Sequence, residues 1–134
     1  MDFPEEINTF LKQPEFMVLS TLRQNGTIQM SIVWYEFRDD VFYISVTIDR
    51  AKYKNIKRNP NVTFVIVNKD NPYQFVQVRG KATISKEKTP EVYALTDRLS
   101  AHYTGNPVFQ GDPEHKQNRV TITITPLAYT THGF

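Results

Sequence analysis

The segment from Ser45 to Pro60, SVTIDRAKYKNIKRNP, gathers the residue types that bind an anion. It contains five of the chain's 16 Lys and Arg residues, and Asp49 is its only acidic residue. Two hydroxyl residues, Ser45 and Thr47, come just before the first of these cations, Arg50. Hydroxyl groups, cations and the free N–H groups of a helix N-terminus are donors that hold phosphate groups in proteins. The segment therefore favours a phosphate site.

A short helix is expected to position these cations. Asp49 can cap a helix that runs from about Arg50 to Asn59, and Pro60 ends it. Arg50 and Lys52 then lie in the first turn, where cations oppose the helix dipole and need a reason to be present. Lys52 shares a face with Asn55, while three further cations point outward: Lys54, Lys57 and Arg58.

Two other interpretations of this segment stay open. The cations could simply form a solvated helix surface, which is the usual role of charged side chains on a short helix. A nucleic-acid interface is the third possibility, but it favours a broader positive footprint and stacking aromatic residues. The net charge is only +2, and Tyr53, the only aromatic residue within the segment, is assigned to packing.

Length and composition indicate a single folded domain over residues 1–134. The content of 40% hydrophobic and 13% aromatic residues excludes a disordered chain. The lack of cysteine excludes disulfides, thiolate metal ligands and a cysteine nucleophile, and it fits a reducing, cytoplasmic location. No apolar run has membrane-spanning length, the N-terminal residues lack the features of a signal peptide, and the three histidines are too dispersed to predict a metal site.

Alternating apolar patterns and turn residues predict six strands and a mainly β fold with short helices. Asn25-Gly26 is a strong hairpin signal between the first two strands. Helices are expected over Asp2–Gln13 and, after a Thr89 cap, over residues 90–104. The expected strands are Phe16–Leu22, Ile28–Phe37, Val41–Val46, Val62–Val67, Phe75–Ser85 and Arg119–Thr125. Mostly antiparallel strands with short helices between them predict a barrel-like fold with helical caps.

Three stretches carry a resemblance to a known family: LSTLRQNGTIQMSIVWYEF, YISVTIDRAKYKNIKRNPNVTFVIVNKDNPYQFVQVRGKATI and RVTITITPLAYTTHGF. In this order they resemble the pyridoxamine 5′-phosphate oxidase-like split-barrel family, from about Phe10 to Gly133. The likeness is greatest to its small branch of deazaflavin (coenzyme F420)-dependent and FMN-binding oxidoreductases. The resemblance implies a six-stranded antiparallel split β-barrel, that is, an FMN-binding split barrel with capping helices. It also implies a homodimer with the cofactor at the subunit interface.

The same resemblance implies which residues would bind the cofactor. Its phosphate would be held by Ser45, Thr47, Arg50 and Lys52, with Asn55 on the same helix face. The ring would lie along the second strand, near Gln29, Ser31, Val33 and Trp34. The partner subunit would contribute Tyr73, Gln77 and Arg79. Each of these residues also has a structural interpretation: solvated strand face, core, dimer interface or loop anchor.

The predicted function is an oxidoreductase that transfers a hydride between coenzyme F420 and a small organic substrate. FMN is the alternative cofactor, because Gln74 stands where family members often carry a basic residue that would attract the acidic tail of F420. A non-catalytic cofactor carrier of the same fold is the second hypothesis, and a nucleic-acid binder is the third. No catalytic residue is predicted, because the chemistry would belong to the cofactor. The short chain disfavours pyridoxamine phosphate oxidation itself.

Overall fold

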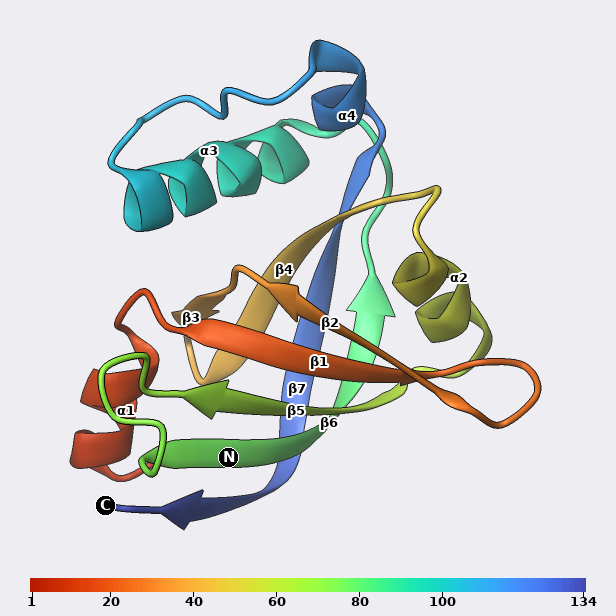
Figure 1. The fold of residues 1–134 in the computed structure, drawn as a ribbon. Coiled ribbons are helices and arrows are strands. Elements are labelled where there is room, and N and C mark those ends of the chain that lie inside the picture. The colour runs from red at the N-terminus through yellow and green to blue at the C-terminus, as the bar shows by residue number, and fades with distance from the viewer.

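Seven antiparallel strands form one curled sheet in the computed structural model, which describes residues 1–134 (Figure 1). The strands are β1 (Phe16–Leu22), β2 (Ile28–Val33), β3 (Glu36–Arg38), β4 (Val41–Thr47), β5 (Asn61–Val67), β6 (Phe75–Ile84) and β7 (Arg119–His132). Their order across the sheet is β2-β1-β5-β6-β7-β4-β3. The helices are α1 (Glu5–Leu11), α2 (Ala51–Arg58), α3 (Pro90–Thr104) and α4 (Pro113–Gln117).

The sheet curls because the chain passes directly from one of its edges to the other. The expected strand Ile28–Phe37 is broken at Trp34 and Tyr35, so the structure has seven strands where six were expected. Strand β2 pairs only with β1, and β3 pairs only with β4, at the opposite edge. The three residue steps from Val33 to Glu36 span at most about 11 Å. The two edges must therefore approach each other, which gives the predicted split barrel.

Alternation along the strands fills the inside of this barrel. On β5, for example, Val62, Phe64 and Ile66 are buried and their neighbours are only partly covered. The core cluster comprises 22 buried residues, and Phe42 of β4 packs against Phe64 of β5 with ring centroids 4.9 Å apart. Such burial of apolar side chains is the main stabilising contribution to the fold.

Strand β7 is longer than the predicted Arg119–Thr125 and pairs along the whole of β6. A register shift between Arg79 and Gly80 allows this long strand to bend. Gly80 is required there, because a Cβ atom would lie 2.7 Å from Ile124 Cγ2 and 2.9 Å from the Thr125 carbonyl oxygen.

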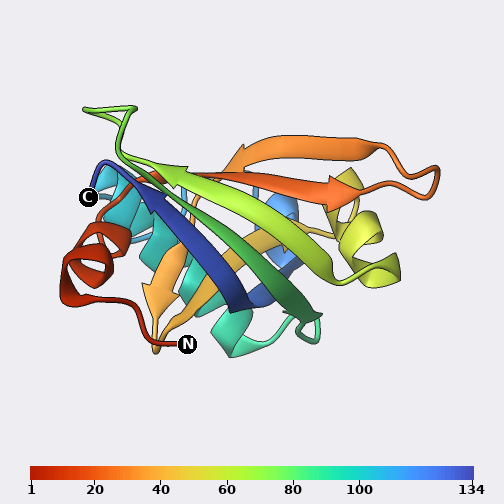
Figure 2. The ribbon, with the colours of Figure 1, turned by 90° about the horizontal axis from the view of Figure 1, so that it is seen from below.

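The helices cover different parts of the barrel (Figures 1 and 2). Helix α1 closes one end with Ile7, Phe10 and Leu11, as its spacing predicts. Figure 2 shows β5, β6 and the C-terminal part of β7 on the side of the barrel away from α3, although β7 also contacts α3. Helix α3 begins as predicted, with Thr89 Oγ1 accepting a hydrogen bond from the Val92 N–H. None of the four helices is long and apolar enough to cross a membrane.

The second half of the helical cover differs from the sequence prediction. Residues 90–117 form an arm in which α3 is followed by a loop and the short helix α4, and α4 was not expected. Helix α2 has Arg50, rather than Asp49, at its N-cap, and no side chain caps it. The predicted Asp49 cap is therefore absent, and the first turn of α2 keeps its N–H groups free of a capping side chain.

Candidate functional site

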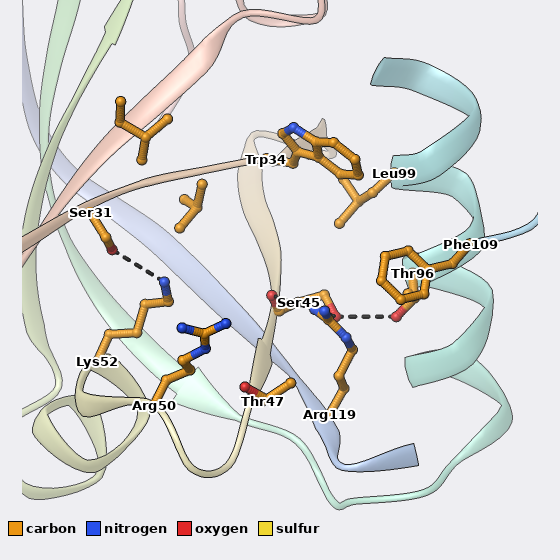
Figure 3. Close-up of a pocket in the computed structure, with 12 residues that line it drawn as sticks. Ser31, Trp34, Ser45, Thr47, Arg50, Lys52, Thr96, Leu99, Phe109 and Arg119 are labelled. Atoms are coloured by element: carbon orange, nitrogen blue, oxygen red, sulfur yellow. Dashed lines mark hydrogen bonds between the residues drawn. The ribbon is translucent and has the colours of Figure 1, made fainter. Parts of the chain in front are cut away.

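A pocket of about 480 Å3 opens between the barrel and the arm (Figure 3). This volume lies within the range of about 300–1,000 Å3 that is typical of small-molecule sites. Strands β2, β4 and β7 and the start of α2 form one side, and the arm forms the other. The lining residues are Ser31, Ile32, Val33, Trp34, Ser45, Thr47, Arg50, Lys52, Thr96, Leu99, Phe109 and Arg119.

One end of the pocket carries three cations that lack acidic partners. None of Arg50, Lys52 and Arg119 forms an ion pair, whereas all five ion pairs of the protein lie elsewhere. Lys52 Nζ donates only to Ser31 Oγ, at 3.2 Å. Burial lowers the pKa of Lys52, and the nearby charges of Arg50 and Arg119 lower it further. This repulsion means that an anion bound here would stabilise all three cations.

A buried hydroxyl group also lies at this end. Thr47 is 5% exposed, and its Oγ1 atom makes no hydrogen bond of ordinary geometry in the protein, although the Thr47 hydroxyl is close enough to the Asp49 carboxyl to lower the pKa of that carboxyl. Leaving such a group unpaired costs about 1–3 kcal/mol, so native structures seldom keep one without a reason. In Figure 3 the Arg50 guanidinium lies between Thr47 and the Lys52 ammonium group. The Thr47 hydroxyl can donate to the same anion that the cations attract.

Helix α2 adds backbone donors to this end of the pocket. Its first N–H group with a backbone acceptor is that of Lys54, which donates to the Arg50 carbonyl at 3.3 Å. The N–H groups of residues 51–53 have neither a backbone acceptor nor a capping side chain. Free N–H groups of this kind, at the positive end of the helix, attract anions.

The other end of the pocket is apolar and aromatic. Trp34 leaves the sheet at the crossing between β2 and β3, and its ring stacks on Tyr103 of α3 with centroids 5.1 Å apart and an angle of 3°. Leu99 of α3 and Phe109 of the arm's loop face the same space (Figure 3). A ligand that suits both ends would carry an anionic group and a flat, largely apolar group.

The structure brings seven of the predicted site residues together in this pocket: Ser31, Val33, Trp34, Ser45, Thr47, Arg50 and Lys52. Two others lie beside the pocket rather than in it. Gln29 Oε1 accepts a hydrogen bond from Thr21 Oγ1 at 3.1 Å, and Asn55 Nδ2 donates to the same Thr21 oxygen at 3.0 Å. This buried chain of hydrogen bonds links β2, β1 and α2, and it therefore fixes where α2 presents its cations.

The remaining three predicted residues do not line this pocket. Tyr73 is 76% exposed in the loop before β6, and Gln77 and Arg79 are exposed on the outer face of β6. Arg79 faces Thr63 across the ladder from β5 to β6. The resemblance assigns these three residues to a partner subunit, and their exposure leaves them available to one.

Four lining residues were not predicted: Ile32, Thr96, Leu99 and Phe109. Arg119 also lines the pocket and was not among the predicted site residues. Three of the four belong to the arm, where the sequence indicates an amphipathic helix and a loop. Amphipathic spacing shows that one helix face is covered, but it does not show that the face also borders a pocket.

Comparisons with known proteins identify the family and the fold of this chain. Residues 3–133 match the family described as Pyridoxamine 5′-phosphate oxidase. A solved structure named F420 reductase is 32% identical, with a TM-score of 0.81 over 96% of this chain and 98% of that one. General stress protein 26 from Bacillus anthracis is 25% identical, with a TM-score of 0.71 over 96% and 92%. The heme storage protein HutZ from Vibrio cholerae shares the fold at 13% identity, with a TM-score of 0.73 over 100% and 97%.

Proposed function

We propose that this chain, which belongs to the pyridoxamine 5′-phosphate oxidase family, is an oxidoreductase that binds a phosphorylated flavin-type cofactor in the pocket beside α3. The observation that carries the proposal is the convergence of three cations that form no ion pair on the buried Thr47 hydroxyl, which makes no hydrogen bond of ordinary geometry. That donor set suits a phosphate group.

The residues of the pocket fit both parts of such a cofactor. Arg50, Lys52, Thr47 and the free N–H groups of α2 would hold the phosphate. The ring would lie toward Trp34, with strand β2 along one edge. When bound, a flavin or deazaflavin supplies hydride transfer. The protein's own contribution is to bind and orient the ring and to exclude water with the apolar side of the pocket.

Coenzyme F420 is the cofactor we propose first, and FMN is the alternative. The 32% identity to a protein named F420 reductase over nearly the whole chain supports F420. Gln74 supplies no positive charge for an acidic tail; its side chain instead bonds Asn68 and the Gly133 carbonyl. The acceptor would be a small organic molecule with an electron-poor double bond.

A non-catalytic carrier on the same fold is the second candidate. HutZ, with the same fold, is named as a heme storage protein. In this chain no histidine, methionine or tyrosine lines the pocket, so these usual protein ligands of heme iron do not face it. A carrier of the flavin-type cofactor itself fits the pocket as well as an enzyme does, and turnover distinguishes the two.

We also propose that two copies of the chain form a homodimer through the outer face of β2, β1 and β5. Ile28, Met30 and Ile32 are 59–68% exposed side by side along the outer face of β2. The pairing registers place Ser20 and Thr63 beside Met30, and Arg79 of β6 follows in the same row. An exposed apolar patch of this kind is typical of an interface. Such a dimer would bring Tyr73, Gln77 and Arg79 to the partner's cofactor.

The dimer is tested with a charged substitution at its expected centre. Met30→Asp should convert a dimer into a monomer in sedimentation velocity at micromolar concentration, because an unpaired carboxylate would be buried. Lys86→Asp, on an exposed loop outside these three strands, should leave the dimer intact. A monomeric wild-type protein would contradict the shared interfacial site.

The cofactor assignment is tested by titrating the purified protein with F420 and, separately, with FMN. Quenching of Trp34 fluorescence would report binding, because Trp34 is the only tryptophan and lines the pocket. The proposal predicts micromolar or tighter binding of F420, and preferential binding of FMN would move the protein to the FMN branch. Absence of binding to both would contradict the proposed function. Consumption of bound reduced cofactor by nitro- or enone-type acceptors would distinguish an enzyme from a carrier.

A further inference from the structure

The guanidinium group of Arg119 is held in the pocket by neutral groups only. Its Nε donates to the His115 carbonyl at 3.1 Å, and its Nη1 lies 3.3 Å from both the carbonyl oxygen and Oγ of Ser45. Its Cζ atom lies 4.9 Å from the centre of the Phe109 ring. Nη2 has no acceptor in the protein. The negative charge of Asp49 raises the pKa of Arg119, but Asp49 lies beyond ion-pair distance.

The direction of the neighbouring hydrogen bonds follows from the number of hydrogens available. Thr96 Oγ1 donates its one hydrogen to the Val92 carbonyl at 3.0 Å. It can therefore only accept from Ser45 Oγ, which lies 3.1 Å away. Ser45 Oγ in turn accepts from Arg119 Nη1. The hydroxyl hydrogen of Ser45 is thus already used, whereas Ser31 only accepts from Lys52 and keeps its hydrogen free.

We propose that Arg119 is a third cationic ligand of the anion in this pocket, and that Ser45 and Thr96 are positioning residues that hold its guanidinium in place. This inference rests on the proposed function, because it assigns residues of the same site. It also changes the role of Ser45, which the resemblance makes a direct phosphate ligand. The free donors that face the anion are then Arg50, Lys52, Thr47 and Arg119.

The charges in the pocket support this assignment. Burial lowers the pKa of Arg119 and the charge of Arg50 lowers it further, so the free protein holds Arg119 in repulsion with its neighbours. An anion between them would relieve this repulsion. Three facing cations suit a group with more than one negative charge, such as a phosphomonoester, or a phosphodiester followed by carboxylates.

The position of Arg119 also connects the anion to the arm. Thr96, Phe109 and His115 all belong to residues 90–117, and each contacts either Arg119 or its partner Ser45. Figure 3 shows Ser45 bonded to Thr96 across the gap between β4 and α3. Without the hydrogen bond between Ser45 and Thr96, Arg119 would remain in the pocket, but its guanidinium group could rotate away from its present orientation.

The test compares ligands that differ only in their phosphate-bearing part. The pairs are FMN with riboflavin, and F420 with the matching deazaflavin whose ribityl side chain carries no phosphate. The ratio of affinities within a pair reports the contribution of the phosphate side alone. Arg119→Gln should lower this ratio at least tenfold and leave binding of the phosphate-free ligand unchanged. Lys86→Gln, which removes an exposed positive charge elsewhere, should change neither.

The positioning role requires a second set of variants. Ser45→Ala and Thr96→Val should each lower the ratio three- to tenfold, and Thr96→Ser should restore it, because serine keeps the accepting hydroxyl. A Thr96→Val protein with an unchanged ratio would exclude the positioning role.

The two proposals fail in different ways. If Arg50→Gln lowers the ratio and Arg119→Gln does not, Arg119 is not a ligand, while the proposed function stands. If the wild-type protein binds no member of either pair, the proposed function fails first. Thermal melting of every variant identifies a loss of binding that comes from unfolding.

Discussion

The barrel and the arm are held in place by different forces. The barrel encloses a cluster of 22 buried residues, and Phe42 alone has four aromatic neighbours in it: Phe3, Tyr35, Phe37 and Phe64. The buried residues of α3, such as Val92 and Leu95, do not belong to that cluster. Polar contacts tie the arm to the barrel, including Tyr103 to Glu15 and Arg98 to Glu36.

This difference divides the pocket into two functional parts. The apolar core fixes the strand and helix that carry Thr47, Arg50 and Lys52, so the anion end is rigid. The apolar wall, with Leu99 and Phe109, belongs to the arm, where α3 buries Val92, Leu95 and Leu99 outside the main cluster and the Phe109 N–H donates to Asp97 within the arm. We therefore expect the anion end to set cofactor binding and the arm to admit different acceptors.

The largest expected effect is on the barrel core. Phe42→Ala should lower the free energy of unfolding by about 3–5 kcal/mol, because Phe42 is fully buried among aromatic rings. Phe109→Ala, in the partly exposed loop of the arm, should lower it by less than about 1 kcal/mol. Urea denaturation measures both. Similar losses in the two variants would contradict the distinction between barrel and arm.

The next effect concerns the link between α3 and the barrel. The Tyr103 hydroxyl donates to the Glu15 carbonyl and accepts from the Tyr35 N–H at 3.2 Å. Burial raises the pKa of Tyr103, so the hydroxyl remains a donor at neutral pH. Tyr103→Phe should cost about 1–2 kcal/mol of unfolding free energy, because it leaves both buried groups unpaired. A Tyr93→Phe control should be neutral, since Tyr93 forms no side-chain hydrogen bond.

A smaller effect is expected at the ion pair between α3 and β3. Arg98 binds both carboxylate oxygens of Glu36, at 2.8 and 3.1 Å, but half of the Arg98 side chain is exposed. Glu36→Gln should therefore cost only about 0.5–1 kcal/mol at pH 7.

The pH dependence of this ion pair has a defined sign. Burial raises the pKa of Glu36, but the hydrogen bonds and charges of Arg98 and Arg38 outweigh it and lower the pKa below the ordinary value of 4.5. The ion pair therefore contributes its full stabilisation of the folded protein at pH values above 4.5, the ordinary pKa of glutamate. This contribution is lost as the pH falls through the lowered pKa of Glu36. Urea denaturation at pH 7 and pH 3 should show a smaller difference in unfolding free energy between wild type and Glu36→Gln at pH 3. A difference that grows at pH 3 would contradict the assignment.

The smallest expected effect is on the pH dependence of cofactor binding. Burial and neighbouring cations lower the pKa of Lys52 below 10.5, and a bound anion would raise it again. Because the complex then binds more protons than the free protein, affinity should fall a few-fold between pH 8 and 9.5. Lys52→Arg should flatten this dependence, since arginine stays charged throughout. Equal pH profiles would exclude Lys52 from the anion contact.

Local sequence features were sufficient to group the residues at one end of the pocket. Strand alternation and Pro60 defined the strand and helix on either side of Asp49, so Thr47, Arg50 and Lys52 could be grouped before the structure was known. Chain topology was not visible at this level. The sequence predicts that Trp34 and Tyr35 continue β2. Nothing in their side-chain types indicates that the chain leaves one edge of the sheet here and joins the opposite edge.

The contribution of the arm could not be predicted for a different reason. Thr96, Leu99 and Phe109 reach the pocket through the docking of α3, which depends on long-range contacts such as those of Tyr103. The state of a hydroxyl group is also a tertiary property: Ser45 and Thr47 look alike in the sequence, yet only Thr47 lacks a partner.

The central claim is that the cations at the start of α2 bind the cofactor phosphate, and one measurement tests it directly. Cofactor affinity is measured by Trp34 fluorescence for wild type, Arg50→Ala, Lys52→Ala and the control Lys86→Ala. If the hydrogen bonds to phosphate are charge-assisted, each of the first two variants should lose about 1.5–3 kcal/mol of binding free energy, and the control none. Unchanged affinity in both Arg50→Ala and Lys52→Ala would contradict the phosphate assignment.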